Sequence, residues 1–302
     1  MILLKQMIIL FLVMMLGYMM AQKKVIDKKV SKSLSWIIVN IANPALIISG
    51  SQGNHIEKKE MLFLIILAFG LFLFLILLAE IIIPVFKPDS SEKGAYKMLF
   101  VFSNIGFMGL PIISSVYGSK GLLYGSVFLL PFNILIYTYG IMCMSKQKTS
   151  IRQMIIKLFN IGLIASIISL VLAVNNVTIP NFAGQIVTML SALTAPLSMM
   201  VIGASFTEIS IKHMFRDVRL LLFALLKLVI IPIIGITVVK FITSDNILQG
   251  VCFIMLATPS GSMVAMMAEQ YNGNHITAAK GVAFTTVLSV ITMPLLFAIM
   301  GI

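Results

Sequence analysis

LFLIILAFGLFLFLILLA, residues 62–79, contains no charged side chain and is long enough to cross the hydrocarbon core of a bilayer. Similar runs recur throughout the 302 residues, of which 60% are hydrophobic and only 11% are charged. A soluble domain averages about 25% charged residues, and its core could not bury this much apolar surface. The sequence therefore predicts an all-α polytopic membrane protein.

The apolar runs predict ten membrane-spanning helices and leave no segment long enough for a soluble domain, so 1–302 is expected to be a single transporter domain. The approximate limits of the spans are 3–21, 34–50, 61–83, 98–117, 122–144, 158–174, 183–204, 220–242, 250–270 and 279–301.

The net charge of +12 is spread over the short links between the spans, which argues against a nucleic-acid partner. Of the 22 Lys and Arg residues, sixteen fall in links on one side of the membrane and four fall on the other. Because basic links stay in the cytoplasm, we expect a multi-pass plasma-membrane protein with both termini extracytoplasmic.

Two pairs of similar segments indicate that the chain consists of two halves. ANPALIISGS (42–51) resembles APLSMMVIGAS (195–205), and SNIGFMGLPI (103–112) parallels LATPSGSMVA (256–265). The halves, 1–145 and 151–302, each hold five predicted spans, so the second half must enter the membrane in the opposite sense. Such inverted five-helix repeats are typical of secondary transporters.

Residues that interrupt helices gather in the fourth and ninth spans. Gly106, Gly109 and Pro111 in one span, and Pro259 and Gly261 in the other, are expected to unwind the helix near mid-membrane. Unpaired backbone groups at that depth are tolerated only when they line a cavity or are buried in protein. We therefore expect broken helices four and nine to cross.

Half-helix ends at such a crossing predict an anion site, because helix N-termini carry partial positive charge and free N–H groups. Asn104 is the favoured side-chain ligand, since it lies at the break. An asparagine in a span forms an interhelical bond more often than it binds a ligand, so both roles stay open for the others. The candidate substrate-binding residues are Asn43, Asn104, Pro111, Asn133, Thr258, Pro259, Ser260 and Ser262.

Ionisable residues are scarce within the spans. Glu80 and Lys227 lie in the third and eighth spans, which are equivalent in the two halves, so they are candidates either for an ion pair or for independent snorkelling. Lys227 is expected only about 10 Å into its span, at 1.5 Å per residue. We therefore expect no fixed charge at the centre, and the missing carboxylate argues against a proton-driven pump.

No sequence motif indicates an enzyme, a cofactor or a metal site. HExxH, G-x-S-x-G and Walker A motifs are absent, and the two cysteines and three histidines are not arranged with metal-ligand spacing. We therefore expect a protein without catalytic activity.

The runs SNIGFMGLPI (103–112) and ATPSGSMVAMMAEQYNG (257–273), with the helices around Pro44 and Pro196, make the whole chain resemble the auxin efflux carrier family. This family includes plant auxin exporters and bacterial malate-permease-like proteins. The resemblance implies broken helices that cross at Pro111 and Pro259. It also implies elevator-type movement of a core bundle against a scaffold of helices one, two, six and seven.

The same resemblance implies that an organic anion binds near the crossing with help from Asn104. The link from Ser145 to Lys157 is too short for the long cytoplasmic loop of plant members, which leaves auxin itself in doubt. The sequence thus predicts a secondary transporter of a small organic anion, such as malate or an auxin-like acid, in the lipid bilayer.

The alternative is a sodium- or proton-coupled symporter or antiporter of the bile-acid-symporter type, because backbone carbonyls freed at a helix break can hold sodium. The sequence leaves open the substrate, the direction of transport, the coupling ion and whether the chain forms a homodimer.

Overall fold

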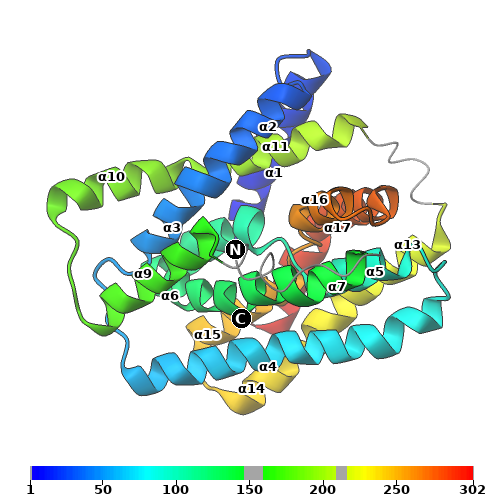
Figure 1. The fold of residues 1–302 in the computed structure, drawn as a ribbon. Coiled ribbons are helices and arrows are strands. Elements are labelled where there is room, and N and C mark those ends of the chain that lie inside the picture. The colour runs from blue at the N-terminus through cyan, green and yellow to red at the C-terminus, as the bar shows by residue number, and fades with distance from the viewer. Residues whose placement is uncertain (1, 146–158, 209–215, 302) are drawn as a thin grey trace.

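The computed structural model describes residues 2–145, 159–208 and 216–301, and within these ranges the chain is all-helical with no β-strand (Figure 1). Six helical segments are long and apolar enough to cross a membrane, and three further apolar helices are shorter. The predicted class, an all-α polytopic membrane protein, is therefore supported. The predicted link between the two halves falls mostly on residues 146–158, outside the described ranges.

The helices are α1 Ile2–Gln22, α2 Lys28–Ile37, η1 Ile38–Ala42, α3 Asn43–Ser49, α4 Lys58–Ile82, η2 Ile83–Phe86, α5 Lys93–Val101, η3 Ile105–Gly109, α6 Leu110–Leu135, η4 Ile136–Gly140, α7 Ile141–Met144, α9 Ile161–Val174, α10 Asn181–Ala192, α11 Thr194–Ser205, η5 Phe206–Glu208, α13 Val218–Leu225, η6 Leu226–Ile230, α14 Ile231–Ile242, α15 Asn246–Ala257, α16 Ser262–Gln270 and α17 His275–Met300. Helical residues lie in each of the ten predicted ranges. The number of membrane crossings stays a prediction, since length and composition qualify only six of the described segments.

The α4 helix shows why these segments belong in a bilayer. Its 25 residues extend about 37 Å at 1.5 Å per residue, more than the hydrocarbon core requires. Leu64 and Leu71 pack inside the protein, whereas Leu62, Ile66 and Ile81 are 57%, 63% and 68% exposed. A helix that is apolar on both its packed and its exposed face is stable only where lipid replaces water.

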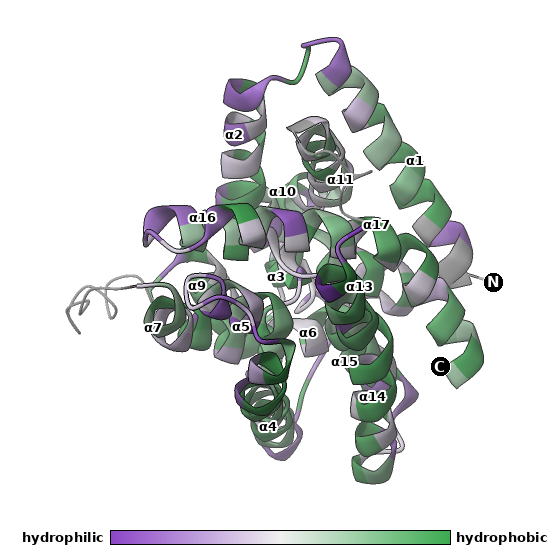
Figure 2. Ribbon diagram, turned by 90° about the vertical axis from the view of Figure 1, so that its right-hand side faces the viewer, coloured by the Kyte–Doolittle hydropathy of each residue, from purple (hydrophilic) through white to green (hydrophobic). Residues whose placement is uncertain are grey.

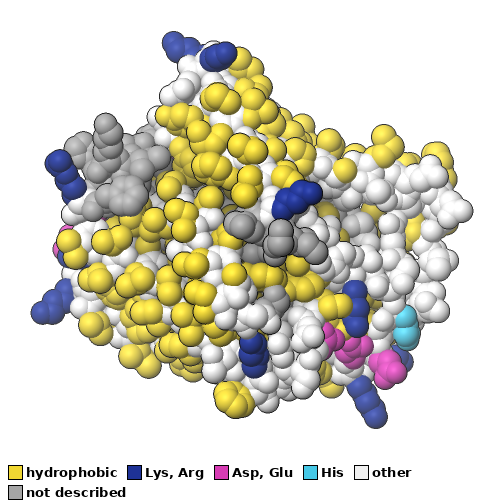
Figure 3. All heavy atoms as spheres, turned by 180° about the vertical axis from the view of Figure 1, so that it is seen from behind, with side chains coloured by type: hydrophobic (Ala, Val, Ile, Leu, Met, Phe, Trp, Pro, Cys, Tyr) yellow, Lys and Arg dark blue, Asp and Glu magenta, His cyan; other side chains and the backbone are white. Residues whose placement is uncertain are grey.

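Most of the other helices resemble α4 in their hydropathy. Hydrophobic residues dominate the helices, while hydrophilic residues gather in the turn between α1 and α2 and at the C-terminal end of α16 (Figure 2). The rear face of the molecule presents a broad hydrophobic surface (Figure 3). Exposed apolar patches of this extent indicate contact with a membrane rather than with water.

The helices form two groups. α1, α2, α3, α10 and α11 lie together on one side of the molecule, and α4, α14 and α15 lie on the opposite side (Figure 1). α1 packs most extensively on α11, because Gly17 and Gly203 bring the two backbones together. A Cβ on Gly17 would collide with the Met200 carbonyl oxygen, and one on Gly203 with that of Met14.

Helix α6 contains a bend that the sequence placed between two spans. Gly118 adopts φ 61° and ψ −152°, a left-handed conformation that only glycine adopts readily. The predicted link between the fourth and fifth spans, residues 118–121, begins at this residue. α6 therefore consists of two helical stretches that change direction at Gly118.

Candidate functional site

Two helices are interrupted at neighbouring positions in space. Residues 102–104 are non-helical between α5 and η3, and residues 258–261 are non-helical between α15 and α16. Ser103 and Ser260 form an isolated antiparallel bridge that joins the two interruptions.

Backbone hydrogen bonds hold this crossing together. The Asn104 N–H donates to the Pro259 carbonyl at 2.7 Å, and the Gly261 N–H donates to the Phe102 carbonyl at 2.8 Å. A peptide group left unpaired at membrane depth costs several kcal/mol. The two hydrogen bonds avoid this cost, because each break supplies a backbone partner to the other.

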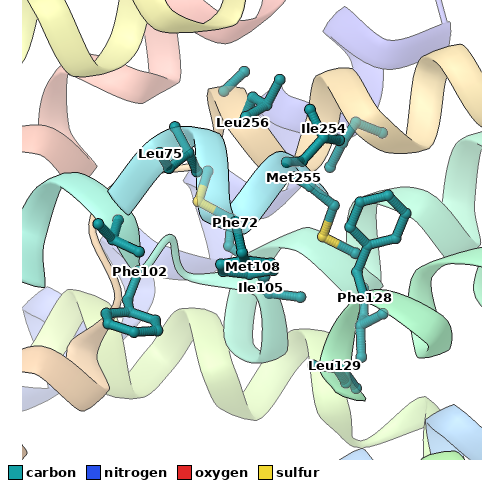
Figure 4. Close-up of a cluster of buried hydrophobic side chains, with 14 of the residues drawn as sticks. Phe72, Leu75, Phe102, Ile105, Met108, Phe128, Leu129, Ile254, Met255 and Leu256 are labelled. Atoms are coloured by element: carbon teal, nitrogen blue, oxygen red, sulfur yellow. The ribbon is translucent and has the colours of Figure 1, made fainter. Parts of the chain in front are cut away.

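Apolar side chains from α4, α6 and α15 surround the first break (Figure 4). The Phe102 ring centroid lies 6.3 Å from that of Phe72 and 5.6 Å from that of Phe132. The break is thus held in packed protein and not against lipid.

The position of the first break differs from the one predicted. Gly106 and Gly109 lie in the π-helical turn η3, and Pro111 lies in the first turn of α6, beyond the interruption at 102–104. A π-helical turn shifts the backbone hydrogen-bond pattern, so the missing N–H of Pro111 is accommodated without unwinding. The expected crossing at Pro111 is therefore corrected to Ser103, whereas Pro259 and Gly261 lie in the second break as predicted.

A cavity of about 290 Å³ lies beside the crossing. Its walls come from η1 and α3, the first break with η3, α6 and η4, the segment that begins α9, and the second break with α16. Its polar lining residues are Asn40, Asn43, Ser103, Asn104, Asn133, Tyr137 and Asn160.

Two of the predicted asparagines present buried amide atoms without a partner. Asn104 Nδ2 and Asn43 Oδ1 make no hydrogen bond in the described part of the chain. Most buried polar side-chain atoms are hydrogen-bonded, so an unpaired donor and an unpaired acceptor on two residues that line one cavity require an explanation. A bound molecule that offers both an acceptor and a donor would supply it.

The other asparagines of the wall are engaged with their own helices. Asn133 Nδ2 donates to the Leu129 carbonyl and Asn40 Nδ2 to the Trp36 carbonyl, both at 2.8 Å. Asn160 Oδ1 accepts the Leu163 N–H at the start of α9. Asn40 and Asn160 were not selected from the sequence, although Asn160 stands two residues before Gly162 just as Asn104 stands two before Gly106.

Two helix N-termini face the cavity. Gly106 and Phe107 from the start of η3, and Gly261 and Met263 from the start of α16, line its wall. The first N–H groups of a helix lack intrahelical acceptors, and that end carries partial positive charge. The cavity therefore receives positive potential from both broken helices.

Lys227 lies far deeper than its sequence position suggested. Its side chain is 0% exposed, and Nζ donates to the Phe100 carbonyl at 3.0 Å and to Ser103 Oγ at 2.7 Å. The expectation of a centre without fixed charge is therefore wrong. The signal was available, since an ionisable residue within an apolar span is a functional candidate by default.

Glu80 and Lys227 do not pair in the structure. Glu80 forms an ion pair with Lys97 and accepts a hydrogen bond from the Tyr139 hydroxyl at 2.9 Å. Glu80 lies at the end of α4 and is about half exposed, whereas Lys227 points into the crossing. The ion pair that the sequence left open is therefore not formed.

The remaining predicted residues do not line the cavity. Thr258 Oγ1 donates to the Met255 carbonyl at 3.3 Å, and Ser260 Oγ donates to the Leu99 carbonyl at 2.7 Å. Ser262 begins α16 and is half-buried. Only the Ser260 hydroxyl bonds across the crossing, and the proposed contact of these residues with substrate stays a prediction.

No group of three or more His, Cys, Asp or Glu side chains that could hold a metal ion occurs in the described ranges.

Comparison with known proteins agrees with this architecture. A family model described as "Membrane transport protein" matches residues 2–160 and 151–297. An uncharacterized transporter of Methanocaldococcus jannaschii is 24% identical over 301 residues, covering 95% of this chain and 96% of the relative. An uncharacterized transporter of Methanothermobacter thermautotrophicus is 22% identical over 291 residues, covering 93% of each.

These matches cover nearly the whole chain and describe transporters rather than enzymes. They coincide with the paired helix breaks and with a polar cavity inside an apolar helical bundle. The chain is therefore a multi-pass membrane protein that belongs to the membrane transport protein family, which is the auxin efflux carrier family.

Proposed function

We propose that this protein is a secondary transporter of a small organic anion that carries a hydrogen-bond donor besides its carboxylate. The observation that supports this most strongly is that Asn104 and Asn43 both line the cavity and each keeps a buried amide atom without a partner, the donor Asn104 Nδ2 and the acceptor Asn43 Oδ1. An unsatisfied buried polar group costs about 1–3 kcal/mol, and a bound carboxylate and donor would remove that cost. Malate and auxin-like acids have both groups.

The proposed topology has ten membrane crossings in two inverted five-helix repeats, 1–145 and 151–302, in the plasma membrane with both termini outside the cytoplasm. Its supports are the basic links on one side of the membrane, the helical segments in all ten ranges and the pairing of the two breaks. Introduced cysteines at 51–59 and 175–181 should react with a membrane-impermeant thiol reagent applied to sealed cells, and those at 23–32 should not. The reversed pattern would overturn this topology.

Transport proceeds by elevator-type movement. The cavity lies between α3 and α9 on one side and the crossing on the other: Asn43 and Gly162 line one wall, and Asn104 and Gly261 line another. In this proposal α1, α2–α3, α9 and α10–α11 form the scaffold, and sliding of the crossing past them exposes the cavity to each side in turn. A site between two rigid groups changes access without being dismantled.

The test is uptake of labelled mono- and dicarboxylates into proteoliposomes, with and without sodium and proton gradients. Asn104→Ala should raise the apparent dissociation constant about tenfold, because it removes one neutral hydrogen bond and tenfold corresponds to 1.4 kcal/mol. Asn175→Ala is the matched control, since Asn175 is exposed at the end of α9 and its side chain bonds only the Val171 carbonyl.

Preference for a cationic solute would overturn the proposal. Strict dependence on a sodium or proton gradient would replace it with the coupled symporter or antiporter.

A further inference from the structure

A single residue, Ser103, lies between the ammonium group of Lys227 and the cavity. Its Nζ donates to Ser103 Oγ at 2.7 Å, and Ser103 lines the cavity, whereas Lys227 itself does not. A serine hydroxyl accepts one hydrogen bond while it donates another. Ser103 is therefore placed to accept from the lysine and to donate to a group bound in the cavity.

The backbone around Lys227 supplies a hydrogen-bond acceptor for its side chain. Its second acceptor is the Phe100 carbonyl, in the last turn of α5, where the helix carries partial negative charge. On the far side of the break, the N-terminal end of η3 faces the cavity with partial positive charge. The Lys227 ammonium group thus offsets the partial negative charge at the C-terminal end of α5. The cavity is left next to the partial positive charge at the start of η3.

No protein carboxylate balances this charge in the described part of the chain. The ion pairs there are Lys97–Glu80, Lys120–Asp245 and Arg219–Glu92. None of the acidic side chains described is buried, whereas Lys227 is completely buried. An unpaired charge in a protein interior is strongly unfavourable, and such residues within membrane spans mark functional sites.

We propose that Lys227 is a specificity-determining residue whose ammonium group, acting through Ser103, balances a single carboxylate of the substrate. The site contains one ammonium group and no carboxylate among the described residues around it. It is therefore neutral when the bound substrate is a monoanion. A second carboxylate would leave an uncompensated negative charge in a medium of low dielectric. The inference rests on the proposed function and narrows it to monocarboxylates, so malate becomes the poorer of the two example substrates.

The experiment compares acids with their uncharged amides. Binding of indole-3-acetate, indole-3-acetamide, lactate, lactamide and malate is measured on the purified full-length protein for the wild type, Lys227→Met, Lys227→Gln and Lys227→Arg. Each sample is first checked for a monodisperse size-exclusion profile. The amides keep the shape of the acids, so the ratio of acid affinity to amide affinity isolates the charge.

The wild type should prefer a monocarboxylate to its amide and to malate by about tenfold or more, since tenfold is 1.4 kcal/mol. Lys227→Met and Lys227→Gln should lose about tenfold for the acids and less than about threefold for the amides. Lys227→Arg should keep most of the preference for acids. Gln preserves a hydrogen-bond donor for Ser103 without the charge, so it separates the charge of Lys227 from a purely structural role.

Recovery of acid binding by Lys227→Gln, or equal losses for acid and amide, would overturn the inference while leaving the organic-anion carrier intact. Absence of binding by every acid to the wild type would overturn the proposed function, and the inference with it. Preference of the wild type for malate over the monocarboxylates would overturn the inference even if none of the variants folds.

Discussion

The two helix breaks are alike in backbone structure and different in chemistry. In both, a short extended segment separates two helices, and each contributes one serine to the bridge. At the second break, Ser260 is satisfied inside the protein by the Leu99 carbonyl and by Thr285, whose hydroxyl accepts the Ser260 N–H at 3.1 Å. At the first break, Asn104 keeps an unpaired donor in the cavity wall.

This difference indicates a division of labour between two similar segments. The second break is a fixed support in which Ser260 is satisfied internally, whereas the first break holds the unpaired Asn104 donor and lies beside the buried Lys227. Because the two breaks share a backbone plan, only their side chains distinguish them. Substitutions at matched positions of the two breaks can separate these roles.

The largest effect is expected at the close approach of the breaks. A Cβ on Gly261 would lie 3.1 Å from the Ser103 carbonyl oxygen and 3.3 Å from that of Phe102, and these backbone atoms cannot move aside independently. Gly261→Val should reduce uptake on the order of a hundredfold, as displacements near 1 Å do at binding sites. Membrane insertion should persist.

Gly70→Val is the matched control for this prediction. Gly70 is an exposed residue of α4 that does not line the cavity, and a Cβ there meets nothing within 4 Å. Uptake in proteoliposomes, normalised to inserted protein, measures both variants. Equal losses in the two would contradict the view that the second break is the rigid support.

The next effect concerns the sign of the charge at the first break. Asn104→Asp should weaken binding of a carboxylate by more than the tenfold expected for Asn104→Ala, because it places a negative charge beside the anion. Equilibrium binding of indole-3-acetate measures the difference. Tighter binding by Asn104→Asp would point to a cationic guest held by the freed carbonyls.

A smaller and different effect is expected when the two bridge serines are compared. Ser260→Ala removes the bond to the Leu99 carbonyl and should lower stability by about 1 kcal/mol without changing affinity. Ser103→Ala should lower affinity for the acid instead, because it separates Lys227 from the cavity. Thermal unfolding and binding of both variants distinguish the cases, and a pure affinity loss in Ser260→Ala would reverse the assignment.

The smallest effect is expected for the proline that the sequence emphasised. Pro111 lies within helical backbone beyond the break, so Pro111→Ala should change uptake by no more than about twofold. Pro259→Ala should impair uptake more, because it removes a restraint on the non-helical segment that accepts the Asn104 N–H. Comparable uptake by the two variants would show that neither proline defines a break.

Much of the site was predictable from residue types. Asn104 and Gly261 were selected because polar and helix-breaking residues at membrane depth need a reason, and both line the cavity. Pro111 was misjudged because a proline signals distortion without locating it, and a π-helical turn can absorb it. Asn40 and Asn160 were not chosen, since nothing in a linear sequence places η1 and α9 against the first break.

The sequence by itself determined that the chain lies in a membrane, because no other environment is compatible with apolar runs of this length and so few charges. It also indicated which two predicted spans contain a break, because glycine and proline act locally, but it placed the first break at Pro111 and not at residues 102–104. Only the tertiary structure decided which polar groups remain without a hydrogen-bond partner and where the Lys227 ammonium group lies. Hydrogen-bond satisfaction and charge compensation depend on side chains from distant helices, here Lys227 of η6 and Ser103 of the first break, and no local pattern encodes their meeting.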